Sequence, residues 1–120
     1  MPEIHRDNRG FFHRSYCQKE LEKVGIIFDV KQGNISENSD KYTLRGFHYQ
    51  VSPTQESKVI TCVRGSIYNV VLDVRRGSNS WGQWTAAEIC SRGKQSIYVP
   101  AGCANAFLTL SESTVVHYYM

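Results

Sequence analysis

Short runs of apolar and β-branched residues alternate with glycine-containing turns through most of this 120-residue chain. After an apolar run at 25–30 and a polar stretch at 33–41, the runs are 42–50, 58–63, 66–74, 84–90, 95–99, 106–110 and 114–119. The turns between them include Arg64-Gly65, Arg76-Gly77-Ser78-Asn79, Arg92-Gly93 and Pro100-Ala101-Gly102. Many short strands at near-regular spacing are typical of a β-sandwich or barrel. The sequence therefore predicts an all-β fold.

The links between the runs give finer predictions. Arg64-Gly65 separates two runs by two residues, which favours a β-hairpin. One short helix is expected at 18–24, where Leu21 and Val24 lie three apart and packing would have to stabilise the two turns. Because there is no repeat, low-complexity tract or linker, we expect a single domain over residues 1–120. The chain stops directly after the run 114–119, which favours a truncated form.

Composition and charge exclude several classes of protein. The chain is 41% hydrophobic and 21% charged, which argues against disorder. Its net charge of +3 is dispersed, so neither nucleic acid nor a membrane surface is an expected partner. No apolar run is long enough to cross a bilayer and no signal-peptide core is present, so we expect a cytoplasmic protein. The cysteines lack CxxC spacing and are expected to be free thiols; they are Cys17, Cys62, Cys90 and Cys103.

The most informative stretch is Leu-Arg-Gly-Phe-His-Tyr-Gln at 44–50. Residues two apart on a strand share a face, so His48 and Gln50 are expected to point the same way. A buried or half-buried histidine on a sheet face is a candidate base, because an imidazole titrates near neutrality. The stretch therefore points to proton chemistry, with a strand histidine held by structural hydrogen bonds as the alternative.

The same parity sorts three other strands into faces. It groups Lys58 with Ile60 and Cys62, Asn69 with Val71 and Asp73, and Val116 with Tyr118. If these faces line the interior, one cavity holds His48, Lys58 and Tyr118. The histidine can take a proton from a carbon beside a carbonyl, the lysine can stabilise the enolate, and the tyrosine can return a proton. The structural alternative is a lysine turned to water and a tyrosine that closes the core.

Longer motifs carry a resemblance to a known family. They are DNRGFF at 7–12, LRGFHYQ at 44–50, Lys58 with VRG at 63–65, VLDVRRGS at 71–78, GQW at 82–84 and VPAG at 99–102. In their order and spacing they resemble the dTDP-4-dehydrorhamnose 3,5-epimerase family along nearly the whole chain. The resemblance implies a cupin-type jelly roll, a double-stranded β-helix that needs no metal or other cofactor. It also implies a homodimer in which the partner donates part of each pocket.

The resemblance further implies an activity and a site. The activity is inversion of C3 and C5 of a nucleotide-linked 4-keto-6-deoxyhexose in deoxysugar synthesis. His48 matches the family's base, Tyr118 its acid on the opposite face, and Lys58 the lysine near the C4 oxygen. The positions that match substrate-binding residues are Arg45, Gln32 and Asn34 for diphosphate and sugar, and Arg9 and Phe12 for the nucleotide. Strand parity sets Arg45 opposite His48, so a bulge near Gly46 is needed for both to enter one pocket.

The chain departs from the family's pattern at several positions. Asn105, a further candidate substrate-binding residue, stands where the family has the second histidine of an Ala-His-Gly motif. Asn69 stands where the family usually has Asp, and Arg14 where it has Glu near the nucleotide base. The family's first strand and C-terminal third have no counterpart, and that third holds the Asp that orients the catalytic histidine. Strand parity offers Asp73 as a substitute.

Three hypotheses follow for the function. The first is an epimerase acting at C3, C5 or both, and the second is a non-catalytic binder of sugar nucleotides that retains the binding residues. The third is a metal-dependent cupin, which the sequence disfavours because His48-Tyr49-Gln50 lacks the second histidine of a His-x-His pair and amide oxygens suit transition metals poorly. The unpaired edges of a shortened jelly roll favour an oligomer in each case.

Overall fold

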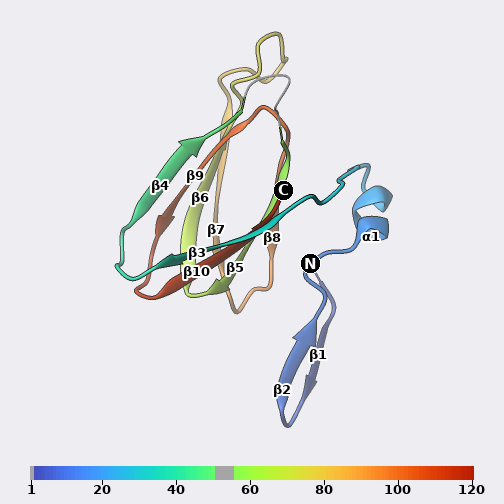
Figure 1. The fold of residues 1–120 in the computed structure, drawn as a ribbon, viewed down its shortest axis with the longest axis vertical. Helices are drawn as coiled ribbons and strands as arrows, with labels where there is room; N and C mark the ends of the chain where they lie inside the picture. The colour runs from blue at the N-terminus through green and yellow to red at the C-terminus, as the bar shows by residue number, and fades with distance from the viewer. Residues whose placement is uncertain (1, 51–55) are drawn as a thin grey trace.

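Two four-stranded antiparallel sheets face each other and form a barrel (Figure 1). The structure is a computed structural model and describes residues 2–50 and 56–120. One sheet has the order β3 (Gly33–Asn38), β10 (Thr114–Tyr119), β5 (Lys58–Arg64), β8 (Ser96–Val99). The other has the order β4 (Leu44–His48), β9 (Ala104–Thr109), β6 (Ser66–Leu72), β7 (Trp84–Cys90). The predicted all-β jelly roll is confirmed.

From β3 onward, successive strands alternate between the two sheets, except for the β6–β7 hairpin. This alternation corrects the hairpin expected at Arg64-Gly65, because β5 and β6 belong to different sheets. Gly65 instead makes a tight corner, with φ +84°, against the side chain of Ser111. The two-residue link therefore signals a sharp reversal and leaves open which strands pair across it.

The core lies between the inner faces of the two sheets. Val116 and Ile67 are fully buried there, on facing sheets. Burial of an apolar side chain of this size contributes about 1.5–3 kcal/mol to folding. The buried core cluster consists of Ile60, Cys62, Ile67, Ile89, Val99, Cys103, Phe107 and Val116. Three of these residues, Ile60, Phe107 and Val116, also line a cavity between the sheets.

The segment before β3, here called the N-terminal arm (residues 2–32), is built differently. It holds the hairpin of β1 (Ile4–Asp7) and β2 (Gly10–His13) and the helix α1 (Gln18–Lys23). The expected helix is confirmed, whereas the hairpin was not predicted and the apolar run 26–30 forms no strand. The hairpin stands off the barrel (Figure 1). After α1, Phe28 is buried, and its ring centroid lies 6.3 Å from that of Tyr98 on the barrel.

Candidate active site

His48 is the last residue of β4, which forms an edge of its sheet. Every residue of this strand is exposed, so His48 is more open to solvent than the half-buried position that the sequence predicts. The reason is topological, because an edge strand has a neighbour on one side only. The strand also ends before Gln50, so strand parity does not relate the two side chains.

A bulge lies in β4 where the sequence needed one. Arg45 pairs with Phe107 and His48 pairs with Asn105, so β4 has two residues between these pairs and β9 has one. The extra residue turns Arg45 and His48 to the same face. At Gly46 the backbone has φ +125°, and a Cβ there would lie 2.6 Å from the Cα of Ala106. Glycine is therefore the residue that this bulge can accommodate.

A cavity of about 140 Å³ opens at this end of the barrel. It brings together the three predicted catalytic residues, His48, Lys58 and Tyr118, which come from β4, β5 and β10. Its lining consists of Ser36, Arg45, His48, Lys58, Ile60, Asn105, Phe107, Val116 and Tyr118. An adjoining hollow of about 310 Å³ shares His48 and Lys58 with it. The parity argument for one cavity holding His48, Lys58 and Tyr118 is confirmed as geometry.

Lys58 and Tyr118 lie next to each other in this cavity. The ammonium nitrogen of Lys58 is 5.8 Å from the centroid of the Tyr118 ring. Burial lowers the pKa of Lys58, and the nearby carboxylate of Glu56 offsets part of that effect. Among the described residues, no carboxylate forms an ion pair with Lys58. A partly desolvated cation in this state favours a ligand that brings negative charge.

Arg45 is held in place by a residue that the sequence analysis missed. Its Nε donates to Oδ1 of the buried Asn38 at 2.5 Å, and the Asn38 amide in turn donates to the Thr114 carbonyl oxygen at 3.2 Å. Asn38 and Ser36 lie on β3, in the stretch that the sequence analysis took as merely polar. On this strand the polar residues Asn34, Ser36 and Asn38 alternate with more exposed ones, including Ile35, so the usual pattern is inverted.

Asp73, the proposed substitute for the histidine-orienting carboxylate, forms its hydrogen bonds within the β6–β7 loop. Its carboxylate accepts hydrogen bonds from Arg75 at 2.9 and 3.0 Å, from Ser78 at 2.7 Å and from Ser80. These bonds, Arg75 first, hold the pKa of Asp73 well below its usual range. Asp73 therefore organises the β6–β7 loop and does not line the cavity. The parity argument failed because β6 ends at Leu72, one residue earlier.

The remaining predicted binding residues lie outside the cavity lining. Gln32 exchanges backbone hydrogen bonds with Met120, and the Asn34 amide lies 3.4 Å from the Met120 sulfur. Asn34 pairs with Tyr118 across β3 and β10, which puts it at the open end of the cavity face. Arg9 and Phe12 sit on the hairpin, where both are exposed, Phe12 by 72%. The structure thus separates the nucleotide-binding candidates from the catalytic ones.

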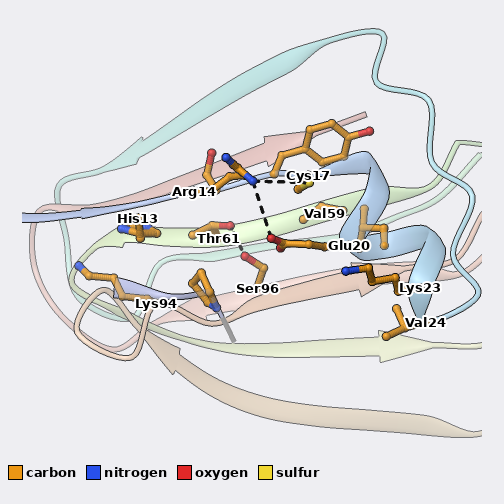
Figure 2. A pocket seen from close by; sticks show the side chains of 14 residues that line it. His13, Arg14, Cys17, Glu20, Lys23, Val24, Val59, Thr61, Lys94 and Ser96 are labelled. Carbon is orange, nitrogen blue, oxygen red and sulfur yellow. Dashed lines mark hydrogen bonds and ion pairs between the residues drawn. The ribbon is translucent and has the colours of Figure 1, made fainter. Parts of the chain in front are cut away.

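A larger hollow, about 470 Å³, lies between the N-terminal arm and the outer face of β5 and β8. Figure 2 shows Arg14 above it, 3.9 Å from a carboxylate oxygen of Glu20 and from the sulfur of Cys17. None of the predicted catalytic or binding residues lines it. This hollow is larger than the cavity beside His48, but the predicted catalytic residues line the smaller cavity.

Comparison with known proteins identifies the fold and the family together. The sequence profile described as dTDP-4-dehydrorhamnose 3,5-epimerase matches residues 1–120. The chain belongs to this family. A dTDP-4-dehydrorhamnose 3,5-epimerase of Sinorhizobium fredii is 36% identical over 112 residues, which cover 93% of this chain and 57% of that protein. The chain therefore spans little more than half the length of this relative.

Two solved structures of dTDP-sugar epimerases superpose closely on the chain. The Bacillus anthracis dTDP-4-dehydrorhamnose 3,5-epimerase, with TDP and PPi bound, gives a TM-score of 0.93 at 36% identity and covers 98% of this chain and 67% of that one. A 3'-monoepimerase of Streptomyces bikiniensis in complex with dTDP-quinovose gives 0.88 at 34% identity, covering 98% and 59%. Both arm and barrel are thus part of the shared architecture.

Two departures from the family's pattern turn out to be in contact. Nδ2 of Asn69 donates to Oδ1 of Asn105 at 2.8 Å. Both residues are at least nine-tenths buried, and Asn105 lines the cavity. Where the resemblance places an Asp and a His, this chain therefore has two neutral amides that bond to each other.

Within residues 2–50 and 56–120, no three His, Cys, Asp or Glu side chains gather in a way that could hold a metal ion. Over the same residues, no helix has the length and apolar character needed to span a membrane. The four cysteines are free thiols, as expected from their spacing.

Proposed function

We propose that this barrel belongs to an epimerase of a nucleotide-diphosphate-linked 4-keto-6-deoxy sugar, acting at C3, C5 or both, in deoxysugar and surface-polysaccharide biosynthesis. The observation that carries the proposal is that His48, Lys58 and Tyr118 line one cavity. A base, a cation and a phenol are the groups needed to exchange a proton on a carbon beside a ketone.

The chemistry needs no group beyond these side chains. The neutral imidazole of His48 takes the proton from the carbon next to the C4 ketone, and the C–H electron pair moves to form an enolate. The ammonium of Lys58 stabilises the negative charge on the enolate oxygen. The phenol of Tyr118 then delivers a proton to the opposite face of the carbon, which inverts it, and the two side chains later exchange protons with water.

The charge of the cavity supports an anionic substrate. Arg45 and Lys58 line it, and no carboxylate does so among the described residues. A guanidinium suits a diphosphate because it can form two parallel hydrogen bonds, and Asn38 fixes its direction here. Asn34, Gln32 and Asn105 are proposed to contact the sugar and diphosphate at the open end.

We further propose that the protein is a homodimer whose arms complete each other's sites. A two-stranded hairpin is marginally stable by itself, and this one stands off the barrel (Figure 1) with Phe11 and Phe12 exposed. One of its contacts with the barrel is made by Lys94, whose ammonium lies 4.0 Å from the Phe11 ring centroid. An exposed aromatic pair beside Arg9 suits a nucleotide held in the cavity of a second copy.

The proposal is tested by proton exchange in heavy water. The protein is incubated in D₂O with dTDP-4-keto-6-deoxyglucose, and deuterium at C3 and C5 is followed by NMR. We expect His48→Ala to slow this exchange by about 10²–10⁴-fold, the usual contribution of a general base. His117→Ala is the matched control. His117 is next to Tyr118 on β10, but its side chain lies on the outer face of the strand, against the ring of Tyr119. Equal exchange by the wild type and His48→Ala would overturn the proposal.

A second candidate function is a non-catalytic sugar-nucleotide binder. For either function we propose a cytoplasmic protein, because free thiols suit a reducing compartment. It is favoured by one observation: no carboxylate in the described cavity lining orients the imidazole of His48. A binder would be thermally stabilised by dTDP-quinovose and would incorporate no deuterium into the 4-keto sugar. An epimerase would be stabilised in the same way and would also incorporate deuterium.

A further inference from the structure

A buried amide interrupts the apolar inner face of β6. Asn69 lies between Ile67 and Val71 on that face and is 1% exposed. Its Oδ1 has no hydrogen-bond partner among the described residues. A buried polar group left half-satisfied has a net cost to folding, so an apolar residue would serve the core better. The amide therefore calls for a role other than stability.

The bond that the Asn69 amide does form is directed at the cavity wall. Nδ2 of Asn69 donates to Oδ1 of Asn105 at 2.8 Å. Asn105 lies on β9 between β6 and β4, directly opposite His48 on the β4 side. Because the oxygen and nitrogen of an amide point in different directions, an Asn105 oxygen turned toward β6 leaves its nitrogen free to face the cavity, which Asn105 lines.

We propose that Asn69 is a positioning residue, which turns the Asn105 amide so that its N–H₂ group faces the cavity beside His48 and donates to an oxygen of the sugar. The identity of the ligand rests on the proposed function, whereas the orientation of the amide does not. Among the other donors that line the cavity, Arg45 and Lys58 carry charge and suit phosphate or enolate. A neutral donor suits a hydroxyl or ketone oxygen and keeps its polarity at every pH.

The orientation can be measured without any activity. In ¹⁵N-labelled wild type, we expect the buried, bonded Asn69 N–H₂ protons to exchange with solvent at least about tenfold more slowly than those of Asn105. Adding dTDP-quinovose should shift the Asn105 N–H₂ signals and slow their exchange. If the Asn105 protons are the slower ones in the free protein, the amide faces the other way and the proposal is wrong.

Inverting the polarity of position 69 gives the matching variant. In Asn69→Asp the carboxylate can only accept, so the Asn105 amide should rotate, its N–H₂ becoming the protected group and its oxygen facing the cavity. We expect kcat/KM for deuterium exchange to fall about tenfold or more. Ile67→Val, a neighbouring core change that alters no hydrogen bond, should keep the wild-type pattern of side-chain amide protection and the wild-type kcat/KM for deuterium exchange.

A compensating change separates positioning from a structural role. In Asn69→Asp/Asn105→His, the carboxylate can again orient a donor toward the cavity, so we expect activity to recover to within about threefold of wild type. The pH profile of kcat/KM should gain an ionisation that the wild type lacks, because an imidazole titrates and an amide does not. The inference would be overturned by an Asn69→Asp protein in which the protection of the Asn105 N–H₂ protons and the epimerase activity are both unchanged. A wild type without deuterium exchange would instead refute the proposed function and leave the amide measurement decisive for the orientation.

Discussion

The barrel and the N-terminal arm treat their aromatic side chains in opposite ways. In the barrel, Phe107 is 7% exposed and lines the cavity. On the arm's hairpin, Phe11 and Phe12 are 56% and 72% exposed. Exposed apolar side chains that lie next to each other often mark a binding surface, which is why the hairpin is the proposed contact with a second copy.

The two regions also divide the chemistry. The groups that can move a proton, His48, Lys58 and Tyr118, are all fixed on barrel strands. The groups suited to a nucleotide, Arg9 and Phe12, lie on the arm. The barrel is thus the proposed catalytic part and the arm the proposed binding part, and the following predictions test that division.

The largest expected effect separates two glycines with similar backbones. Gly46 in the barrel and Gly10 in the arm have φ of +125° and +132°. A Cβ at Gly10 meets nothing within 4 Å, whereas at Gly46 it meets the backbone of Ala106 at 2.6 Å. Gly10→Ala should lower the free energy of unfolding by about 1–2 kcal/mol, the cost of the strained backbone. Gly46→Ala should cost more than about 4 kcal/mol. Chemical denaturation measures both, and equal losses would show that the bulge is not sterically fixed.

The next effect concerns catalysis in the barrel. Lys58→Met keeps the length of the side chain and removes its charge, so the enolate loses its stabilising cation. We expect kcat for deuterium exchange to fall about 10²–10³-fold. Lys41→Met, on the exposed turn between β3 and β4, is the matched control and should leave kcat unchanged. A kcat unaffected by Lys58→Met would remove Lys58 from the chemistry.

Much of the barrel could be predicted from the sequence. The β-branched runs of β5, β6 and β10 and the parity of Lys58, Ile60, Val116 and Tyr118 follow from the two-residue repeat of a strand. The bulge at Gly46 followed from requiring Arg45 and His48 to share a pocket.

Other parts could not be predicted, for physical reasons. β3 has polar residues inside and Ile35 outside, because its inner face lines a polar cavity, so hydrophobic alternation gives no strand signal. The β1–β2 hairpin lacks a buried face of its own. Asn38 was missed with β3, and Asp73 was misplaced because it lies just past the end of β6, where parity no longer applies.

The smallest effect compares two thiols. In the arm, backbone N–H groups of Glu20 and Lys19 lower the pKa of Cys17, with that of Glu20 contributing most. In the barrel, burial raises the pKa of Cys62 to about 11. Because the thiolate is the reactive form, Cys17 should alkylate readily near pH 7.5, and Cys62 should react only after unfolding. Peptide mass spectrometry after iodoacetamide treatment measures both, and early labelling of Cys62 would contradict the packing of the barrel.

Subunit mixing tests the division between catalytic barrel and binding arm most directly. His48→Ala has an intact arm and an inactive cavity, whereas Arg9→Ala/Phe12→Ala has an intact cavity and an inactive arm. Each protein alone should show little deuterium exchange at low substrate concentration. After unfolding and co-refolding at equal amounts, half of the dimers are mixed and each has one complete site, so about a quarter of wild-type activity should return. No recovery, with mixed dimers shown to form, would contradict the account.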